Sequence, residues 1–297
     1  MSEPVVISSG ELTATISPIG AELVSLRDAG AREYMSDGDP RWWSGRAPVL
    51  FPVVGALNGD RYRLDGKEYS IGKHGFARRS MFTLEEHDPC ERVRFVLSDS
   101  EATRAVFPFA FRLELFHSIR GATLMTTATV SNTGDAPLPF SFGFHPAFAW
   151  PLPGGAAKEH HRIVFELDEP QAIRRIDKAG QMLSESFPTP VTGDTLAPDA
   201  SLFEADALIW DAIHSRACSF GAPGGASLAV EWNNCPMLGI WQIPGAPFLC
   251  IEPWQGLADP QGFEGDFRQK PGVIVLEPGT YRSFTLGITV SPPETAP

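Results

Sequence analysis

The chain has 297 residues and a formal net charge of -12, with 36 acidic against 24 basic side chains. This balance argues against nucleic acid or an anionic membrane surface as a partner, because both are bound through basic contacts. Hydrophobic residues make up 43% of the sequence, enough for a large core, and the length fits one large β domain or two smaller domains.

Short β-like runs separated by turn residues fill the first half of the chain. A hairpin is predicted over 62–69, with Asp65 and Gly66 as its type I′ turn. One short helix is expected over 98–107, capped by Ser98 or Asp99. The other predicted strands of this half are 11–17, 21–26, 48–54, 81–86, 92–97, 111–119 and 123–130.

The second half of the chain has the same texture. Its predicted strands are 163–167, 207–210, 217–220, 227–232, 238–242, 248–251, 273–276 and 281–290. Neither a linker nor a repeat of fixed period interrupts the sequence, so we expect a single domain over residues 1–297. About twenty short strands with tight turns indicate an all-β fold, a large antiparallel sandwich with very little helix.

The cysteines and the N-terminus bear on the cellular compartment. Cys90, Cys218, Cys235 and Cys250 are scattered and form no CxxC pair, so free thiols in a reducing compartment are expected. The N-terminus lacks the pattern of a signal peptide, and no apolar stretch approaches the roughly 18 residues of a membrane span. We therefore expect a cytoplasmic protein, and leave open whether it is a monomer or a homodimer.

A largely apolar run at 248–259 has Glu252 as its only carboxylate before the last residue, Asp259. Because side chains alternate along a strand, Cys250 and Glu252 share one face. Pro253 has no N–H to give to a sheet, so the strand is predicted to stop, or to lie at an edge, at Glu252. A lone glutamate on a stiff strand end, beside Trp254, is typical of a general base.

A second run of this kind ends at His145, again directly before a proline. Alternation places Gly143 and His145 on one face that is free of bulk, and Phe142 and Phe144 on an aromatic face opposite. An acid/base-capable residue at each of two such strand ends suggests that the two belong to one site.

Two further residues are candidates for the site. His74 precedes Gly75, which allows a tight turn, and Arg78 adds a cation nearby; an ordinary surface loop is the alternative for this histidine. Asp206 lies at the start of an apolar strand, where capping a turn is the alternative role.

The rest of the sequence offers few groups for other chemistry. Five histidines are interpreted as solvated or incidental: His87, His117, His160, His161 and His214. The histidines and cysteines lack the spacing of a zinc site, so no metal is expected. Without a phosphate loop or a nucleotide fingerprint, the chemistry is predicted to be cofactor-free proton transfer or plain binding.

Four segments in this order resemble the aldose 1-epimerase (galactose mutarotase-like) family, in its bacterial branch of mutarotase-related proteins. They are 49–55 (VLFPVVG), 74–78 (HGFAR), 143–148 (GFHPAF) and 250–254 (CIEPW), the last followed by Gly256 and Asp259. The resemblance spans nearly the whole chain. It implies a large antiparallel β-supersandwich with a small-molecule sugar in an open groove on one sheet.

The resemblance also implies roles for individual residues. Glu252 matches the family's general base and His145 its general acid, while His74 matches the histidine that positions or polarises the ring oxygen. Asp206 matches the aspartate that holds sugar hydroxyls, and Arg78 is expected to line the pocket. Exchange of anomers needs one base and one acid, each typically giving about 10²–10⁴-fold, so no cofactor is required.

The resemblance leaves the substrate open. Trp254 and Phe144 are expected to offer apolar faces to the C–H side of a pyranose. Ala56 stands where the family usually has a basic residue that contacts the sugar, and Arg61 and Arg78 are candidates to replace it. Besides an aldose 1-epimerase, two alternatives remain. One is an enzyme for a hexose 6-phosphate, and the other is a non-catalytic sugar-binding or sensing protein, which Ala56 favours.

Overall fold

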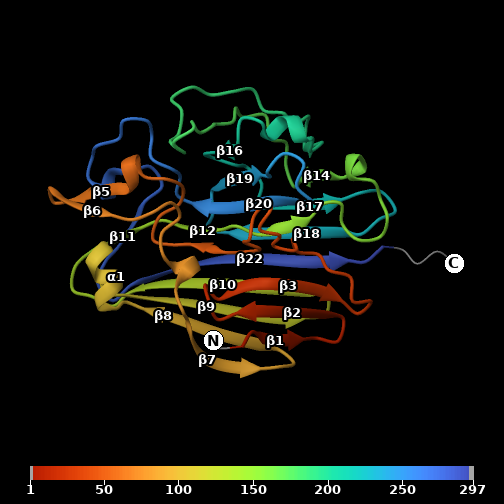
Figure 1. The fold of residues 1–297 in the computed structure, drawn as a ribbon, viewed down its shortest axis with the longest axis horizontal. Helices are drawn as coiled ribbons and strands as arrows, with labels where there is room; N and C mark the ends of the chain where they lie inside the picture. The colour runs from red at the N-terminus through yellow and green to blue at the C-terminus, as the bar shows by residue number, and fades with distance from the viewer. Residues whose placement is uncertain (1–2, 294–297) are drawn as a thin grey trace.

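The computed structural model describes residues 3–293, and most of the regular structure in them is β-strand (Figure 1). Neighbouring strands within the sheets pair in the antiparallel sense, as in the hairpin of β9 and β10. The fold class predicted from the sequence, a large antiparallel β-supersandwich with very little helix, is confirmed. The division into domains stays a prediction.

The largest sheet has nine strands and forms the scaffold of the molecule. Along β9 and β10 buried and partly exposed residues alternate without a break, so one face of this sheet lies on the core and the other meets solvent. Its order is β15 (Thr195–Leu196), β14 (Arg162–Phe165), β17 (Ala217–Gly221), β18 (Ser227–Asn233), β22 (Tyr281–Ser291), β10 (Thr123–Asn132), β9 (Phe111–Arg120), β8 (Arg92–Ser98) and β7 (Thr83–Asp88).

A six-stranded sheet packs against the scaffold and carries the candidate site. One hydrophobic core joins the two sheets, and Phe142 of the smaller sheet stacks on Phe284 of the larger one with ring centroids 4.8 Å apart. The order is β16 (Leu208–Trp210), β19 (Met237–Trp241), β20 (Phe248–Gln255), β12 (Phe142–Phe144) and β4 (Val49–Leu50), with β13 (Ala147–Ala149) also pairing with β20.

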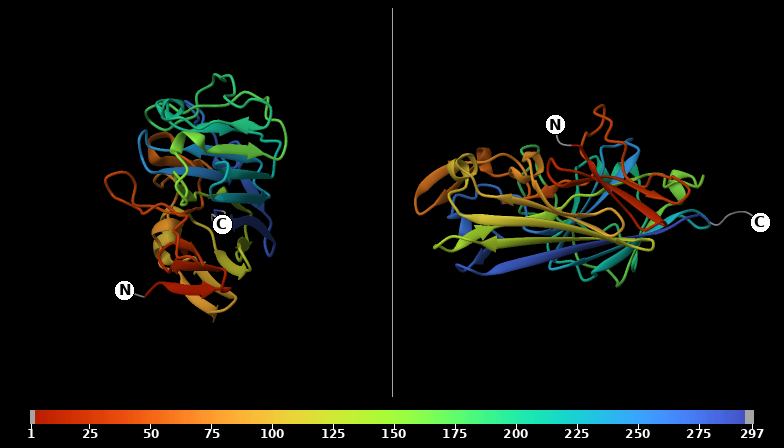
Figure 2. Two further views of the ribbon diagram at one scale, coloured as in Figure 1. Left: turned by 90° about the vertical axis from the view of Figure 1, so that its right-hand side faces the viewer. Right: turned by 90° about the horizontal axis from the view of Figure 1, so that it is seen from below.

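The remaining elements are small. Three strands at the N-terminus lie over β9 and β10 (Figure 2). They are β1 (Val5–Ser8), β2 (Leu12–Ser17) and β3 (Glu22–Asp28). Two further pairs are β5 (Arg61–Leu64) with β6 (Lys67–Ser70), and β11 (Leu138–Phe140) with β21 (Ile274–Leu276). The helices are α1 (Glu101–Val106), η1 (Asn58–Asp60), η2 (Ala77–Arg79), η3 (Lys158–His160), η4 (Ala200–Phe203) and η5 (Phe267–Gln269).

Two local predictions about turns and caps have different outcomes. Asp65 and Gly66 both have positive φ, as the predicted type I′ turn between β5 and β6 requires. The cap of α1 is Ser100 rather than Ser98 or Asp99, because its hydroxyl accepts the N–H of Thr103 in a capping box.

β20 does not stop at Glu252, as the proline had suggested, but runs from Phe248 to Gln255. The N–H of Ile251 donates to the carbonyl of Pro146, so the nitrogen of Pro253, two residues on, faces the same side of the strand. On that side β13 pairs with β20 before the proline and β12 pairs after it. Pro253 lies in the gap between them, where the ladder needs no donor.

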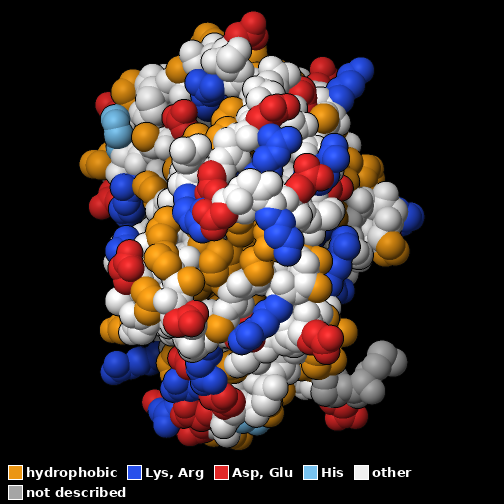
Figure 3. All heavy atoms as spheres, turned by 90° about the vertical axis from the view of Figure 1, so that its left-hand side faces the viewer, with side chains coloured by type: hydrophobic (Ala, Val, Ile, Leu, Met, Phe, Trp, Pro, Cys, Tyr) orange, Lys and Arg blue, Asp and Glu red, His pale blue; other side chains and the backbone are white. Residues whose placement is uncertain are grey.

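The surface and the helices bear on the expected partners. On the face shown in Figure 3, acidic and basic side chains are interspersed around a central area of hydrophobic side chains. Within residues 3–293, none of the helices is long and apolar enough to cross a membrane.

Candidate functional site

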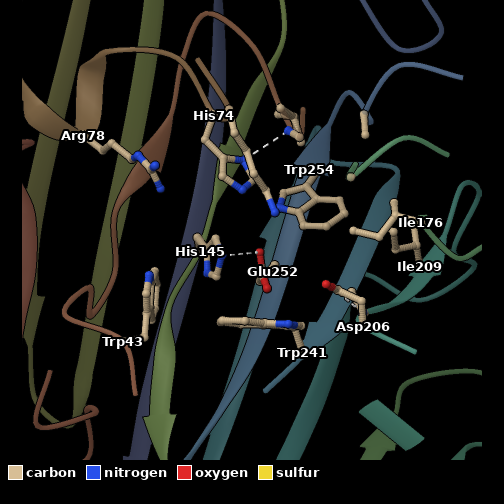
Figure 4. A pocket seen from close by; sticks show the side chains of 16 residues that line it. Trp43, His74, Arg78, His145, Ile176, Asp206, Ile209, Trp241, Glu252 and Trp254 are labelled. Carbon is tan, nitrogen blue, oxygen red and sulfur yellow. Dashed lines mark hydrogen bonds and ion pairs between the residues drawn. The ribbon is translucent and has the colours of Figure 1, made fainter. Parts of the chain in front are cut away.

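A pocket on the six-stranded sheet brings together residues that lie far apart in the sequence (Figure 4). Six of the seven predicted site residues line it: His74, Arg78, His145, Asp206, Glu252 and Trp254. They come from loops and strands of both halves of the chain, and the register of β20 with its neighbours fixes where they meet.

Phe144 is the seventh predicted residue, and it does not line this pocket. Its side chain is buried in the main core and packs edge-on against Phe142, with ring centroids 5.0 Å apart. The alternation that turns Gly143 and His145 toward the pocket turns Phe144 to the opposite face. The prediction of a substrate contact for Phe144 was therefore wrong.

Glu252 and His145 form the centre of the pocket. Both are buried, and Nε2 of His145 lies 3.1 Å from Oε2 of Glu252. The two atoms are not aligned for a hydrogen bond. Within the described chain, Oε2 of Glu252 and Nδ1 of His145 are buried without a hydrogen-bond partner. Unpaired polar atoms of this kind are costly to bury, so they are expected where a ligand completes the site.

Burial shifts the proton affinities of this pair in opposite directions. It raises the pKa of Glu252 well above the usual range, and the neighbouring charge of Asp206 acts in the same direction, while Lys73 opposes it. Burial lowers the pKa of His145 to about 3, helped by the charges of Lys73 and Arg78. Around neutral pH the imidazole is therefore uncharged, and the carboxyl group can take up a proton and release it.

Two glycines make room for Trp254 beside this pair. A Cβ at Gly143 would lie 2.5 Å from Cδ1 of the indole, and a Cβ at Gly239 would overlap its six-membered ring. Gly143 pairs with Trp254 across β12 and β20, and Gly239 pairs with Glu252 across β19 and β20. Only glycine at both positions lets the indole lie across the neighbouring strands and form a wall of the pocket.

His74 is held by a loop that needs an unusual backbone. His74 and Gly75 both have positive φ, and a Cβ at Gly75 would collide with the carbonyl of Phe51. The N–H of Gly55 donates to Nδ1 of His74 at 3.1 Å, which leaves the proton of a neutral ring on Nε2. His74 is 7% exposed, so the alternative of an ordinary surface loop does not hold.

Asp206 combines its two predicted roles. It lines the pocket, and its Oδ1 also accepts the N–H of Ala207 at 2.7 Å, as in a turn cap. Its φ of 64° is rare for residues other than glycine, and Arg175 donates to its carbonyl oxygen at 2.7 Å. The carboxylate is exposed and stands across the pocket from His145 (Figure 4), where it can accept hydroxyl groups.

Sequence reasoning missed several residues of the pocket, of which the most prominent are Trp43 and Trp241. The ring of Trp43 lies 4.6 Å from that of His145 at 31°, and Trp241 meets the same imidazole edge-on at 5.8 Å. Strand alternation with Gly239 could have assigned Trp241 to the pocket face. Nothing local to the loop of Trp43 indicates its contact, which depends on tertiary packing.

Ala56, which stands where a basic residue was expected, is covered by another segment of the chain. Ala56 is buried, and a Cβ at Gly180 would lie 3.0 Å from its methyl group, so the 176–182 segment covers this position. Arg61 does not replace a basic residue there, because it lines a different pocket and pairs with Glu68 at 3.4 Å. Of the two candidates, only Arg78 reaches the pocket of Glu252.

A possible ligand set for a metal consists of the two central residues of the pocket and the buried Cys250 beside them. His145, Cys250 and Glu252 each offer one ligand atom, and these three atoms lie within 4.8 Å of one another. The spacing of the three residues in the sequence did not indicate a metal site. Burial, and then the charge of Glu252, raise the pKa of Cys250 well above its usual range. A metal at this position would have to displace the proton of the thiol, so the uncharged Cys250 favours proton transfer by the other two groups.

The other cysteines and histidines lie outside the pocket. The four cysteines are free thiols, as predicted, and all but Cys90 are buried. His117 and His161 are buried and hydrogen-bonded rather than solvated, which corrects part of the interpretation from sequence. His117, His161 and the exposed His87, His160 and His214 do not line the site.

Comparisons with known proteins agree with this arrangement. The family model described as Aldose 1-epimerase matches residues 4–270. Protein LacX (chromosomal) of Lactococcus lactis subsp. lactis is 30% identical over 289 residues, which cover 94% of this chain and 96% of that protein. A galactose mutarotase related enzyme from Lactobacillus acidophilus is 31% identical, with a TM-score of 0.88 and 97% of each chain covered. A galactose mutarotase-like protein from Lactobacillus casei is 29% identical, with a TM-score of 0.91, covering 97% of this chain and all of that one.

Proposed function

Since the chain belongs to the aldose 1-epimerase family, we propose that it interconverts the α and β anomers of an aldose. The observation that carries the proposal is the pair of Glu252 and His145, which is buried, open to a pocket and 3.1 Å apart without a hydrogen bond. A carboxyl group and an imidazole at this distance can reach the neighbouring anomeric hydroxyl and ring oxygen of one pyranose and exchange protons with them.

The Glu252–His145 pair shares one proton, and the proposed reaction proceeds from the form in which His145 holds it, so that Glu252, as a carboxylate, removes the proton of the anomeric hydroxyl group. His145 gives a proton to the ring oxygen, and the bond between C1 and the ring oxygen breaks to leave an open-chain aldehyde. The aldehyde turns about its bond to C2, and the ring closes on the other face as the two protons return. No group leaves and nothing is oxidised, so the amino acid side chains suffice.

The other residues of the pocket bind and orient the sugar in this proposal. Nε2–H of His74 faces the pocket and can donate to the ring oxygen (Figure 4). Trp43, Trp241 and Trp254 offer apolar surfaces to C–H groups, while Asp206 accepts hydroxyl groups. By excluding water, these walls strengthen the electrostatic effects on the reacting atoms.

A phosphorylated aldose is the second candidate substrate. Lys73 and Arg78 both line the pocket, and neither has an ion-pair partner within residues 3–293. Nε of Arg78 is buried without a hydrogen-bond partner among these residues. Two unpaired cations could hold a phosphate by charge-assisted hydrogen bonds, which supports a hexose 6-phosphate as the alternative.

The test follows the exchange between anomers by NMR for glucose, galactose and glucose 6-phosphate, with and without protein. Acceleration of at least one sugar is expected. Arg78→Gln should slow exchange of the phosphorylated sugar selectively if phosphate binds there, and should affect neutral sugars little. Sugar binding without acceleration for any aldose of a broad panel would instead support a non-catalytic sugar-binding protein.

A further inference from the structure

A buried ion pair lies behind the pocket wall that Ala258 forms. Nζ of Lys270 is 3.3 Å from Oδ1 of Asp259, and the two side chains are 0% and 3% exposed. Nζ also donates a hydrogen bond to the carbonyl oxygen of Leu257. Burying two charges is expensive, and apolar residues of the same size are often as stable. We therefore expect the pair to have a role other than stabilising the fold.

Asp259 connects three segments that are far apart in the sequence. Its N–H donates to the carbonyl of Ala56 at 2.9 Å, and its Oδ2 accepts the N–H of Asn58 at 2.8 Å. Its own carbonyl accepts the N–H of Met182 at 2.8 Å. One residue thus fixes the 56–58 segment against the end of β20 and against the 176–182 segment that covers Ala56.

The same contacts extend to His74 through Gly55. A Cβ at Gly55 would lie 2.5 Å from Cα of Ala258, so the residue before Asp259 presses directly on this glycine. Gly55 and His74 then hold each other by two hydrogen bonds. The N–H of Gly55 donates to Nδ1 of His74 at 3.1 Å, and the N–H of His74 donates to the carbonyl of Gly55 at 3.0 Å.

We propose that Asp259 and Lys270 are positioning residues, which hold Gly55 so that His74 keeps its proton on Nε2 and directs it into the pocket. Asp259 fixes the backbone at Ala56 and Asn58, and so holds Ala258 against Gly55. Lys270 holds the carboxylate and Leu257 in place. The consequence for catalysis rests on the proposed epimerase function, whereas the effect on the tautomer of His74 does not.

The positive charge of Lys270 also favours an uncharged His74 ring, because it lowers the pKa of that histidine. Burial lowers the pKa of His74 well below its usual range, and the neighbouring His145, Lys73, Arg78 and Lys270 lower it further. A neutral ring with its proton on Nε2 is a fixed hydrogen-bond donor. If Gly55 moved away, Nδ1 would lose its donor, and the ring could hold its proton on either nitrogen.

The experiment compares full-length wild type with Asp259→Ala and Lys270→Met. NMR spectra of ¹⁵N-labelled histidine report the tautomer of His74, with His74→Gln used to assign its signals. The wild type should show the Nε2–H form alone, and the two variants a mixture of tautomers. A misplaced donor should lower kcat by about 10- to 100-fold, with a smaller change in KM. Asp259→Asn removes the charge and serves if Asp259→Ala does not fold.

Asp28→Asn is the matched control. Asp28 is also buried, receives hydrogen bonds of 2.7 Å from Arg32 and from Tyr34, and does not line the pocket. Its substitution should lower stability and leave the spectrum of His74 unchanged. Folded variants of Asp259 and Lys270 that keep the wild-type tautomer would overturn the proposal. A wild type that accelerates no sugar would refute the epimerase function, while the spectra would still decide whether the pair positions His74.

Discussion

Two buried histidines, His117 on the scaffold sheet and His145 in the pocket, show what distinguishes a structural group from a reactive one. Burial lowers the pKa of both, to about 4 for His117 and to about 3 for His145. Both nitrogens of His117 have partners, the hydroxyl of Thr126 at 2.9 Å and the carbonyl of Ala21 at 3.2 Å. His145 has an unpartnered Nδ1 within the described residues, and its Nε2 faces Glu252.

The two sheets explain this difference. β9, which carries His117, has one face on the core and one toward solvent, so its buried face lies against the core, with only a small cavity beside His117. β20 is buried along seven of its eight residues, because the core covers one face and the pocket walls cover the other. A polar group on the pocket face is dry but next to a cavity. Burial and a shifted pKa are thus common to both histidines, and an unpartnered nitrogen beside the pocket distinguishes His145.

The largest effect is expected for Glu252→Gln. The amide keeps the shape of the side chain but cannot accept a proton, so the acceleration of anomer exchange should fall by about 10²–10⁴-fold. Glu169→Gln is the control, since Glu169 is equally buried but its carboxylate accepts the N–H groups of His214 and Ser215. Glu169→Gln should lower the free energy of unfolding and leave the rate of anomer exchange unchanged. Equal rates in Glu252→Gln and wild type would remove the base from the mechanism.

Substituting the two histidines tests the comparison directly. His145→Asn should slow anomer exchange by about 10²–10⁴-fold and keep the fold, because no described residue depends on its ring for a hydrogen bond. His117→Asn should keep the rate and lose about 1–3 kcal/mol of unfolding free energy, because Thr126 and the carbonyl of Ala21 lose buried partners. Exchange rates and urea unfolding of both variants give the answer. If His117→Asn exchanged anomers more slowly than wild type and kept its full stability, His117 would not be the structural residue that the comparison with His145 makes it.

Strand alternation accounts for what could be predicted from the sequence. It identified most long strands, and it placed Cys250 and Glu252 on one face of β20, where the structure has them. The same alternation along 111–119 puts His117 on the face of Phe111 and Leu115, so its burial could have been found and was overlooked. Glu252 and His145 were proposed from two strand ends that each precede a proline, and the resemblance to a family then assigned roles to the site residues.

The errors concern features that depend on distant parts of the chain. Whether a proline ends a strand depends on its neighbours, and Pro253 is tolerated because β13 gives way to β12 beside it. The packing of Trp43 on His145 and the cover over Ala56 likewise need segments from elsewhere. Short strands such as β13 have too few residues to show a period, so only pairing with a longer strand defines them.

The pH dependence of stability should separate Glu252 from ordinary surface carboxylates. Because burial raises its pKa in the folded state, the folded protein holds this proton more tightly than the unfolded chain. The stabilising effect of the raised pKa is present in acid and is lost as the pH rises from the unfolded pKa through the folded pKa. Glu252→Gln should therefore gain stability over wild type as the pH rises, by up to about 1.4 kcal/mol per pH unit within that window. Urea unfolding between pH 5 and pH 8 measures the difference, and a constant difference would contradict a raised pKa.

The smallest effect, no change at all, is expected when metal ions are removed. A cation bound by His145, Cys250 and Glu252, whose ligand atoms lie within 4.8 Å of one another, would make His145 a satisfied histidine like His117. The contrast between the two residues would then have another cause. If the pair works by proton transfer alone, dialysis against EDTA should leave the exchange rate unchanged. Added Zn²⁺ should slow exchange by occupying the same atoms, and less so in Cys250→Ala, which lacks one ligand. A rate that falls with EDTA and returns with Zn²⁺ would show that the unpaired atoms of the pocket belong to a metal site rather than to an acid and a base.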